Sequence, residues 1–192
     1  GGWDVSNAVN MSFMFNYCEQ FNQRLDDWDV SNVKDMCAMF CKCKSFNQSL
    51  SSWDVSRVTD MQDMFQGCAA FNQSLDTWNV GNVTYMHHMF AGCSGFNQKL
   101  NTWNVSSVTS MDAMFAHCKT FNQSLSNWNV SRVGNTDSMF YECTTFDQDL
   151  SSWDISHVKN MDFMFLGCHS FDDQSIDSWD MAAAKRPRSM FS

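Results

Sequence analysis

Residues 53–77 read WDVSRVTDMQDMFQGCAAFNQSLDT. The pattern returns every 25 residues along the 192-residue chain, and phenylalanine and cysteine columns keep the same step. A unit this short cannot bury a core alone, so stacked units must share one. We therefore predict a single repeat array over residues 1–192, without a linker or a second domain. Its units start near Trp3, Trp28, Trp53, Trp78, Trp103, Trp128, Trp153 and, one residue late, Trp179.

Two spacings divide each unit. Leu50, Trp53 and Val55 follow an L-x-x-W-x-V pattern, which is typical of a strand with one buried face. The segment 58–68 then carries apolar residues at steps of three and one, which predicts a short helix. Ser56 precedes this segment and is a candidate N-cap. Each coil is thus expected to hold one short parallel strand and one short helix, with every tryptophan stacked on its counterpart one coil away.

These motifs resemble a known family. The L-x-x-W-x-V spacing looks like the strand signature of leucine-rich repeats, and M-F-x-x-C-x-x-F looks like a segment of their BspA-like class. Residues 121–130, FNQSLSNWNV, are similar to bacterial-surface-protein repeats of that class. The resemblance implies an α/β solenoid, a leucine-rich-repeat-like right-handed array of about 7.5 coils. It also implies display at the cell surface, or an extracellular location, and adhesion rather than catalysis.

Composition and motifs exclude several classes. The formal net charge of −9 disfavours nucleic acid as a partner. No uninterrupted apolar run is long enough for a membrane span. The sequence has no nucleophile elbow, no H-E-x-x-H zinc motif and no glycine-rich phosphate loop. We therefore predict that the protein is not an enzyme and that it uses no cofactor.

Short polar residues flank each tryptophan and are predicted to form a flat polar face. The leading hypothesis is a non-catalytic scaffold for protein–protein interaction or adhesion, as part of a surface-displayed or multi-subunit assembly. The alternative is a glycan- or ice-binding module that uses this face, and an ordinary solvated surface is equally compatible with the pattern. The candidate binding residues are Asp54, Thr77, Asn79, Thr102, Asn104, Asn127 and Asn129.

Two further columns are interpreted as structural. The column Asn22, Asn47, Asn72, Asn97 and Asn122 predicts a ladder that satisfies backbone groups, with glutamines beside it doing the same or facing solvent. Seven cysteines occupy one repeat position, which predicts reduced thiols in the core. Cys37 and Cys41 break the pattern, and their redox state is left open.

No metal site is predicted. The column that begins Asp4, Asp29, Asp54 lacks the loop that calcium requires. Cys37 and Cys41 lack the partners of a zinc site. The pair 87–88, His-His, is interpreted as scattered surface histidine, with Asp112 one coil along near His87. The outer side also carries a basic patch in the second coil, at Lys34, Lys42 and Lys44, and an acidic ridge at Asp112, Asp137 and Asp162.

The two ends are expected to differ. The last unit departs from the pattern at residues 182–187 and is predicted to be cap-like, although Met190 and Phe191 keep the register of the Met-Phe pair. An extra residue within 171–176 explains the late Trp179. The N-terminal end is expected to expose apolar residues and to be covered by more chain or by another subunit.

Overall fold

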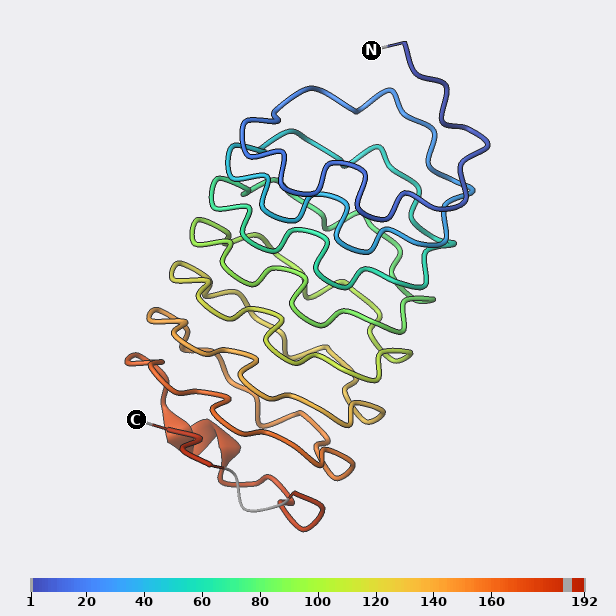
Figure 1. Cartoon of the computed structure of the whole chain (residues 1–192). Coiled ribbons are helices and arrows are strands. Elements are labelled where there is room, and N and C mark those ends of the chain that lie inside the picture. The colour runs from blue at the N-terminus through green and yellow to red at the C-terminus, as the bar shows by residue number, and fades with distance from the viewer. Residues whose placement is uncertain (1, 185–187, 192) are drawn as a thin grey trace.

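The protein is built of coils that lie one on the next, as Figure 1 shows from the N-terminus to the C-terminus. The computed structural model describes residues 2–184 and 188–191. Single parallel bridges join neighbouring coils at 25-residue steps, from Asn10–Asp35 to Asn135–Asn160. Within the described residues, the one helical element is the 3-10 helix η1 (Asp173–Ile176), and no bridge extends into a strand. The predicted leucine-rich-repeat-like α/β solenoid is therefore wrong, because neither its strand nor its helix forms.

The spacing that predicted a helix belongs to consecutive β-turns. The Met64 N–H donates to the Met61 carbonyl at 3.3 Å, and the Cys68 N–H donates to the Phe65 carbonyl at 2.9 Å. Each bond spans three residues, as in a β-turn, whereas the bonds of an α-helix span four. The segment M-x-x-M-F-x-x-C is thus two turns in succession.

The rest of the coil is also built of β-turns. The Trp53 N–H donates to the Leu50 carbonyl at 3.1 Å, and the Val58 N–H donates to the Val55 carbonyl at 2.9 Å. The first and last residues of each of these turns are buried, whereas the two middle residues are half-buried or exposed. In the turn from Met61 to Met64 the third residue, Asp63, has φ of 55°. A type II turn requires a positive φ at that position. Apolar residues three apart are therefore turn corners.

Aromatic side chains form a continuous core through the stack. The rings of Trp103 and Trp128 lie 6.5 Å apart between centroids, with 1° between their planes. The rings of Phe65 and Phe90 lie 5.7 Å apart at 7°. Parallel rings at these separations combine a large buried area with favourable stacking. The prediction that each tryptophan lies on its counterpart one coil away is confirmed for these residues.

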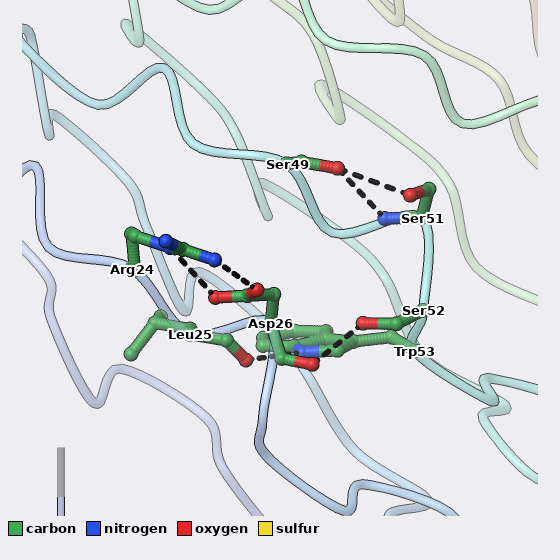
Figure 2. A network of polar contacts seen from close by, with 7 residues as sticks. All are labelled: Arg24, Leu25, Asp26, Ser49, Ser51, Ser52 and Trp53. Carbon is green, nitrogen blue, oxygen red and sulfur yellow. Dashed lines mark hydrogen bonds and ion pairs between the residues drawn. The ribbon is translucent and has the colours of Figure 1, made fainter.

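From Trp53 onward, the buried tryptophans also bond to the preceding coil. The Trp53 indole N–H donates to the Leu25 carbonyl at 2.9 Å, and Figure 2 shows this bond at the edge of the turn. Beside it, the Ser52 hydroxyl donates to the Asp26 carbonyl at 2.8 Å. The same indole bond recurs at Trp78, Trp103, Trp128, Trp153 and Trp179. The indole thus supplies both the packing surface and the donor that a buried carbonyl needs.

The repeat cysteines act as hydrogen-bond donors. The Cys68 Sγ lies 2.9 Å from the Phe40 carbonyl oxygen of the preceding coil, and the contact recurs from Cys43 to Cys168. The seven thiols of this column are free, and five of them are buried. The predicted core column of reduced thiols is therefore confirmed for these five cysteines but not for exposed Cys18 or half-buried Cys168. The hydrogen bond explains why a thiol occupies this position rather than a methyl group.

The asparagine ladder is also confirmed. The Asn47 side-chain oxygen accepts the Asn72 backbone N–H at 3.0 Å and the Gln73 side-chain N–H at 3.0 Å. The same pair of bonds links Asn72 to the next coil. One oxygen therefore satisfies one backbone and one side-chain donor per coil, although these asparagines are not deeply buried.

One core position departs from the pattern, at Thr136. Its side chain is 2% exposed and stands where the neighbouring coils have Met111 and Met161. We expect Thr136→Met to raise the free energy of unfolding by about 1–2 kcal/mol, because it replaces a buried hydroxyl by apolar volume that the other coils accommodate. Chemical denaturation measures this. Thr109→Met, at a half-buried position of the preceding coil, is the control and is expected to change little; a destabilised Thr136→Met would contradict the reasoning.

The ends follow the expectations in part. The extra residue predicted within 171–176 lies at η1, whose first turn is capped by the Asp172 side chain accepting the Gln174 N–H at 3.0 Å. The ring of Phe191 lies 5.7 Å from that of Phe165, so the predicted register of the last Met-Phe pair is confirmed. Residues 185–187 of the predicted cap lie outside the described residues. At the other end Trp3 is 65% exposed, and with its neighbours it lines a shallow hollow.

Candidate functional site

The predicted polar face consists of the exposed residues before and after each tryptophan. The residues after tryptophan are held in Asx turns, in which a side-chain oxygen accepts a backbone N–H two residues on. These bonds measure 3.0 Å at Asp54, 3.2 Å at Asn79, 3.2 Å at Asn104 and 3.1 Å at Asn129. At Asp54 the hydrogen bonds from the Ser56 side chain and backbone lower the pKa of the carboxyl group. Ser56 is thus a donor in a turn, and its predicted helix N-cap role is wrong.

The residues before tryptophan bond to the preceding coil. The Thr77 hydroxyl donates to the Ser51 carbonyl at 3.1 Å, and the Thr102 hydroxyl donates to the Asp76 carbonyl at 3.1 Å. The Asn127 N–H donates to the side-chain oxygen of Asn101 at 2.9 Å. All seven predicted binding residues are exposed. Each nevertheless has a hydrogen-bonding role within the chain, and their role in binding stays a prediction.

A second surface lies over the two successive turns. We define the turn face as the half-buried and exposed side chains of residues 10–17 and of their counterparts at 25-residue steps. Backbone bonds run directly between coils here, for example from the Met61 N–H to the Tyr85 carbonyl at 3.0 Å and from the Phe65 N–H to the Met89 carbonyl at 2.9 Å. The backbone below the turn face is therefore well ordered, while its side chains differ in size, charge and aromatic character from coil to coil.

Exposed aromatic residues gather on the turn face. Phe13, Tyr17 and Tyr85 are 56%, 66% and 48% exposed, respectively. Half-buried Tyr141 lies edge-on to His117, with 5.1 Å between the ring centroids. Aromatic side chains are enriched at the centres of protein interfaces. None of these residues was among the binding residues predicted from the sequence. The signal that would have found them is their departure from the repeat pattern.

Cys37 and Cys41 lie in the two successive turns of the second coil but are buried beneath the turn face. They are 5% and 6% exposed and form a small apolar cluster with Ala38. The Gln62 side-chain N–H donates to the Cys37 sulfur at 2.9 Å, and the Cys41 thiol donates to the Gln66 oxygen at 3.3 Å. Both thiols are free, and burial raises the pKa of each. The turns thus bring the two cysteines together in this cluster.

Charged residues on the outer side are partly paired. The Lys44 Nζ, in the predicted basic patch, lies 2.8 Å from the Glu19 Oε1. Asp162, in the predicted acidic ridge, accepts from Arg188 at 3.0 Å. Asp137 in the same ridge accepts an amide hydrogen bond from Asn160 at 3.1 Å. Exposed pairs of this kind contribute little to stability.

The two histidines are half-buried and lie beside acidic side chains. The His88 Nε2 lies 3.9 Å from a carboxylate oxygen of Asp112 in the next coil. Its other ring nitrogen, Nδ1, lies 3.6 Å from a carboxylate oxygen of Asp63 in the preceding coil. The imidazole therefore lies between two acidic side chains. One potential ligand atom each from Asp63, His87 and His88 lies within 4.8 Å of the others.

Fold and surface together define a repeat protein whose coils are made of β-turns around an aromatic core. A family model described as "Mycoplasma protein of unknown function, DUF285" matches residues 1–103 and again residues 84–192. The chain belongs to this family. The assignment to BspA-like leucine-rich repeats is accordingly wrong. No curated protein and no solved structure matches the chain. None of the described residues forms a helix that is long and apolar enough to cross a membrane.

Proposed function

We propose that the protein is a non-catalytic binding scaffold that contacts a protein partner through its turn face. The observation that carries this proposal is the exposure of Phe13, Tyr17 and Tyr85 on that face. Burying three such side chains against a partner provides the apolar contact on which protein interfaces depend. The regular hydrogen bonding beneath them limits the entropy lost on binding.

The different roles of the repeat positions also support binding through the turn face. The repeated tryptophans, phenylalanines and cysteines are engaged in the core, and the polar face is engaged in turns and ladders. The turn face is where the coils differ from one another, and a surface that differs along the stack can distinguish one partner from another. On the polar face, Thr77 and Thr102 direct their hydroxyl hydrogens to the preceding coil, which weakens the glycan or ice alternative.

Site-specific photo-cross-linking tests the proposal. A benzophenone amino acid is placed at Tyr17 or Tyr85 on the turn face and, as matched controls, at Asn79 or Asn104 on the polar face. The chain is expressed in its native cells, irradiated, and its adducts are identified by mass spectrometry. We expect one discrete protein adduct from the turn face and none from the polar face. The reverse pattern, or no adduct from either turn-face position, would reject the proposal.

Two associated expectations remain predictions. The first is a location at the cell surface. It had been implied by the resemblance to BspA-like leucine-rich repeats, and it is not tested by the family to which the chain belongs. Cover for the N-terminal end, by more chain or by another subunit, remains a prediction that would bury Trp3.

A further inference from the structure

We propose that Asp63, His87 and His88 form a binding site for a divalent transition-metal ion, for which Zn²⁺ is the natural probe. Their potential ligand atoms lie within 4.8 Å of one another on the turn face. Tetrahedral zinc places its donor atoms about 3.3 Å apart, so small rotations of these partly exposed side chains complete the site. Two imidazoles with one carboxylate favour zinc and its neighbours over calcium or magnesium, which prefer oxygen donors alone.

The backbone already holds the three residues in place. The Asp63 N–H donates to the His87 carbonyl at 3.0 Å, which fixes the third coil against the fourth. The His88 N–H donates to the Asp112 carbonyl at 2.9 Å, which fixes the fourth coil against the fifth. The ligands therefore need only side-chain adjustment, and the entropy cost of assembling them is small.

Asp112 completes the arrangement as a positioning residue. Its carboxylate lies 3.9 Å from His88 Nε2, on the side of the ring opposite Asp63. When His88 binds the metal through Nδ1, its Nε2–H points toward Asp112. Carboxylates in this position orient a metal-binding histidine and increase its basicity. Nearby, burial raises the pKa of Asp60, on which the charges of His87 and Asp63 also act.

A metal ion at this site would connect two coils directly and a third through Asp112. Because the coils depend on their neighbours for stability, binding that joins them stabilises the whole array. At a Zn²⁺ concentration about a hundredfold above the dissociation constant, we expect the Tm to rise by about 5–10 °C. This readout does not depend on any partner or activity.

Calorimetric titration with Zn²⁺ under reducing conditions, together with thermal unfolding, tests the site. We expect one equivalent to bind to the full chain and His88→Asn to weaken binding at least tenfold. His88 has φ of 55°, a conformation that asparagine tolerates, so this variant should fold. The matched control is His169→Asn, at an exposed histidine outside the cluster, which should bind as the native chain does. Equal binding by His88→Asn and the native chain would overturn the proposal.

Two further measurements keep the test decisive. His87→Ala should lose binding as His88→Asn does, and Asp112→Asn should weaken it about 10–100-fold, as the loss of an orienting carboxylate does. Co²⁺ replaces Zn²⁺ as a spectroscopic probe. Bands of a histidine and carboxylate site without thiolate charge transfer support the assignment. A thiolate charge-transfer band would assign the metal to cysteine and overturn it.

Discussion

Trp103→Ala is expected to lower the free energy of unfolding by about 4–6 kcal/mol. The side chain is 2% exposed and stacks on Trp128, so truncation leaves a large cavity that costs about 3–5 kcal/mol. It also removes the indole donor from the Leu75 carbonyl, now bonded at 2.9 Å, which adds about 1 kcal/mol or more. A loss of this size is a large part of the stability of a typical domain. Urea denaturation followed by near-ultraviolet circular dichroism measures it.

Two control variants separate the causes. Trp103→Phe keeps an aromatic ring and removes only the donor and part of the volume, so it should cost less than half as much as the alanine variant. Trp3→Ala removes a tryptophan that is 65% exposed and should change the free energy of unfolding by less than about 0.5 kcal/mol. If Trp103→Ala and Trp3→Ala had the same midpoint, the stacked tryptophan column would not be what holds the coils together.

The repeat and its core were predictable from the sequence, because a stacked core places like residues on like. A tryptophan column at 25-residue steps can bury its indoles only if each coil lies on the previous one. The same reasoning predicted the asparagine ladder and the thiol column. Their hydrogen-bond partners were not predictable, since the bond from Cys68 to the Phe40 carbonyl depends on where the turn directs that carbonyl.

The secondary structure was not predictable from apolar spacing alone. A residue and the third one after it lie together on a helix face, but they also form the two corners of a β-turn. The spacing of Met61 and Met64 therefore fits both. A turn signal was present one step further on, where glycine takes the third position of the F-x-x-C turn at Gly67, Gly92 and Gly167, with φ between 71° and 82°. Glycine inside a helix is destabilising, so its presence at this position argues for a turn.

The candidate sites show the same limit. The polar face was predicted from strand alternation and is exposed, yet turns rather than strands make it so. The cluster of Asp63, His87 and His88 depends on which residues of two neighbouring coils meet across the turns. The contact of Asp112 with the His88 ring was not predictable, because it depends on how the turns direct these side chains. Predicting side-chain contacts between coils therefore requires knowledge of the backbone conformation. Predicting the columns of the core requires only the length of the repeat.

Alkaline pH is expected to unfold the protein through its thiol column. Burial raises the pKa of the Cys43 thiol to about 12, and it raises the pKa values of Cys68, Cys93, Cys118 and Cys143 as well. In the unfolded chain these thiols lose their protons near pH 8.5. Above that pH the unfolded state binds fewer protons than the folded state, so stability is complete at lower pH and falls as the pH rises.

The expected effect is large because the five buried thiols act together. Each contributes about 1.4 kcal/mol per pH unit above its unfolded pKa, which sums to about 7 kcal/mol per unit. Against a stability of about 5–15 kcal/mol, the midpoint of unfolding should fall near pH 10. Ionisation would also remove the donor from each bond, such as the one from Cys93 to the Phe65 carbonyl at 3.0 Å. Titration followed by near-ultraviolet circular dichroism measures the midpoint and its steepness.

Because tyrosine and lysine titrate in the same range, variants must assign the effect to the thiols. The double variant Cys93→Ser, Cys118→Ser keeps a donor for each carbonyl but removes two of the five titrating groups. Its free energy of unfolding should therefore fall less steeply with pH, by about two fifths. Cys18→Ser changes an exposed thiol and should follow the native curve. Equal steepness in the native chain and the double variant would mean that the two thiols bind the same number of protons in the folded and unfolded states, and that other groups cause the alkaline unfolding.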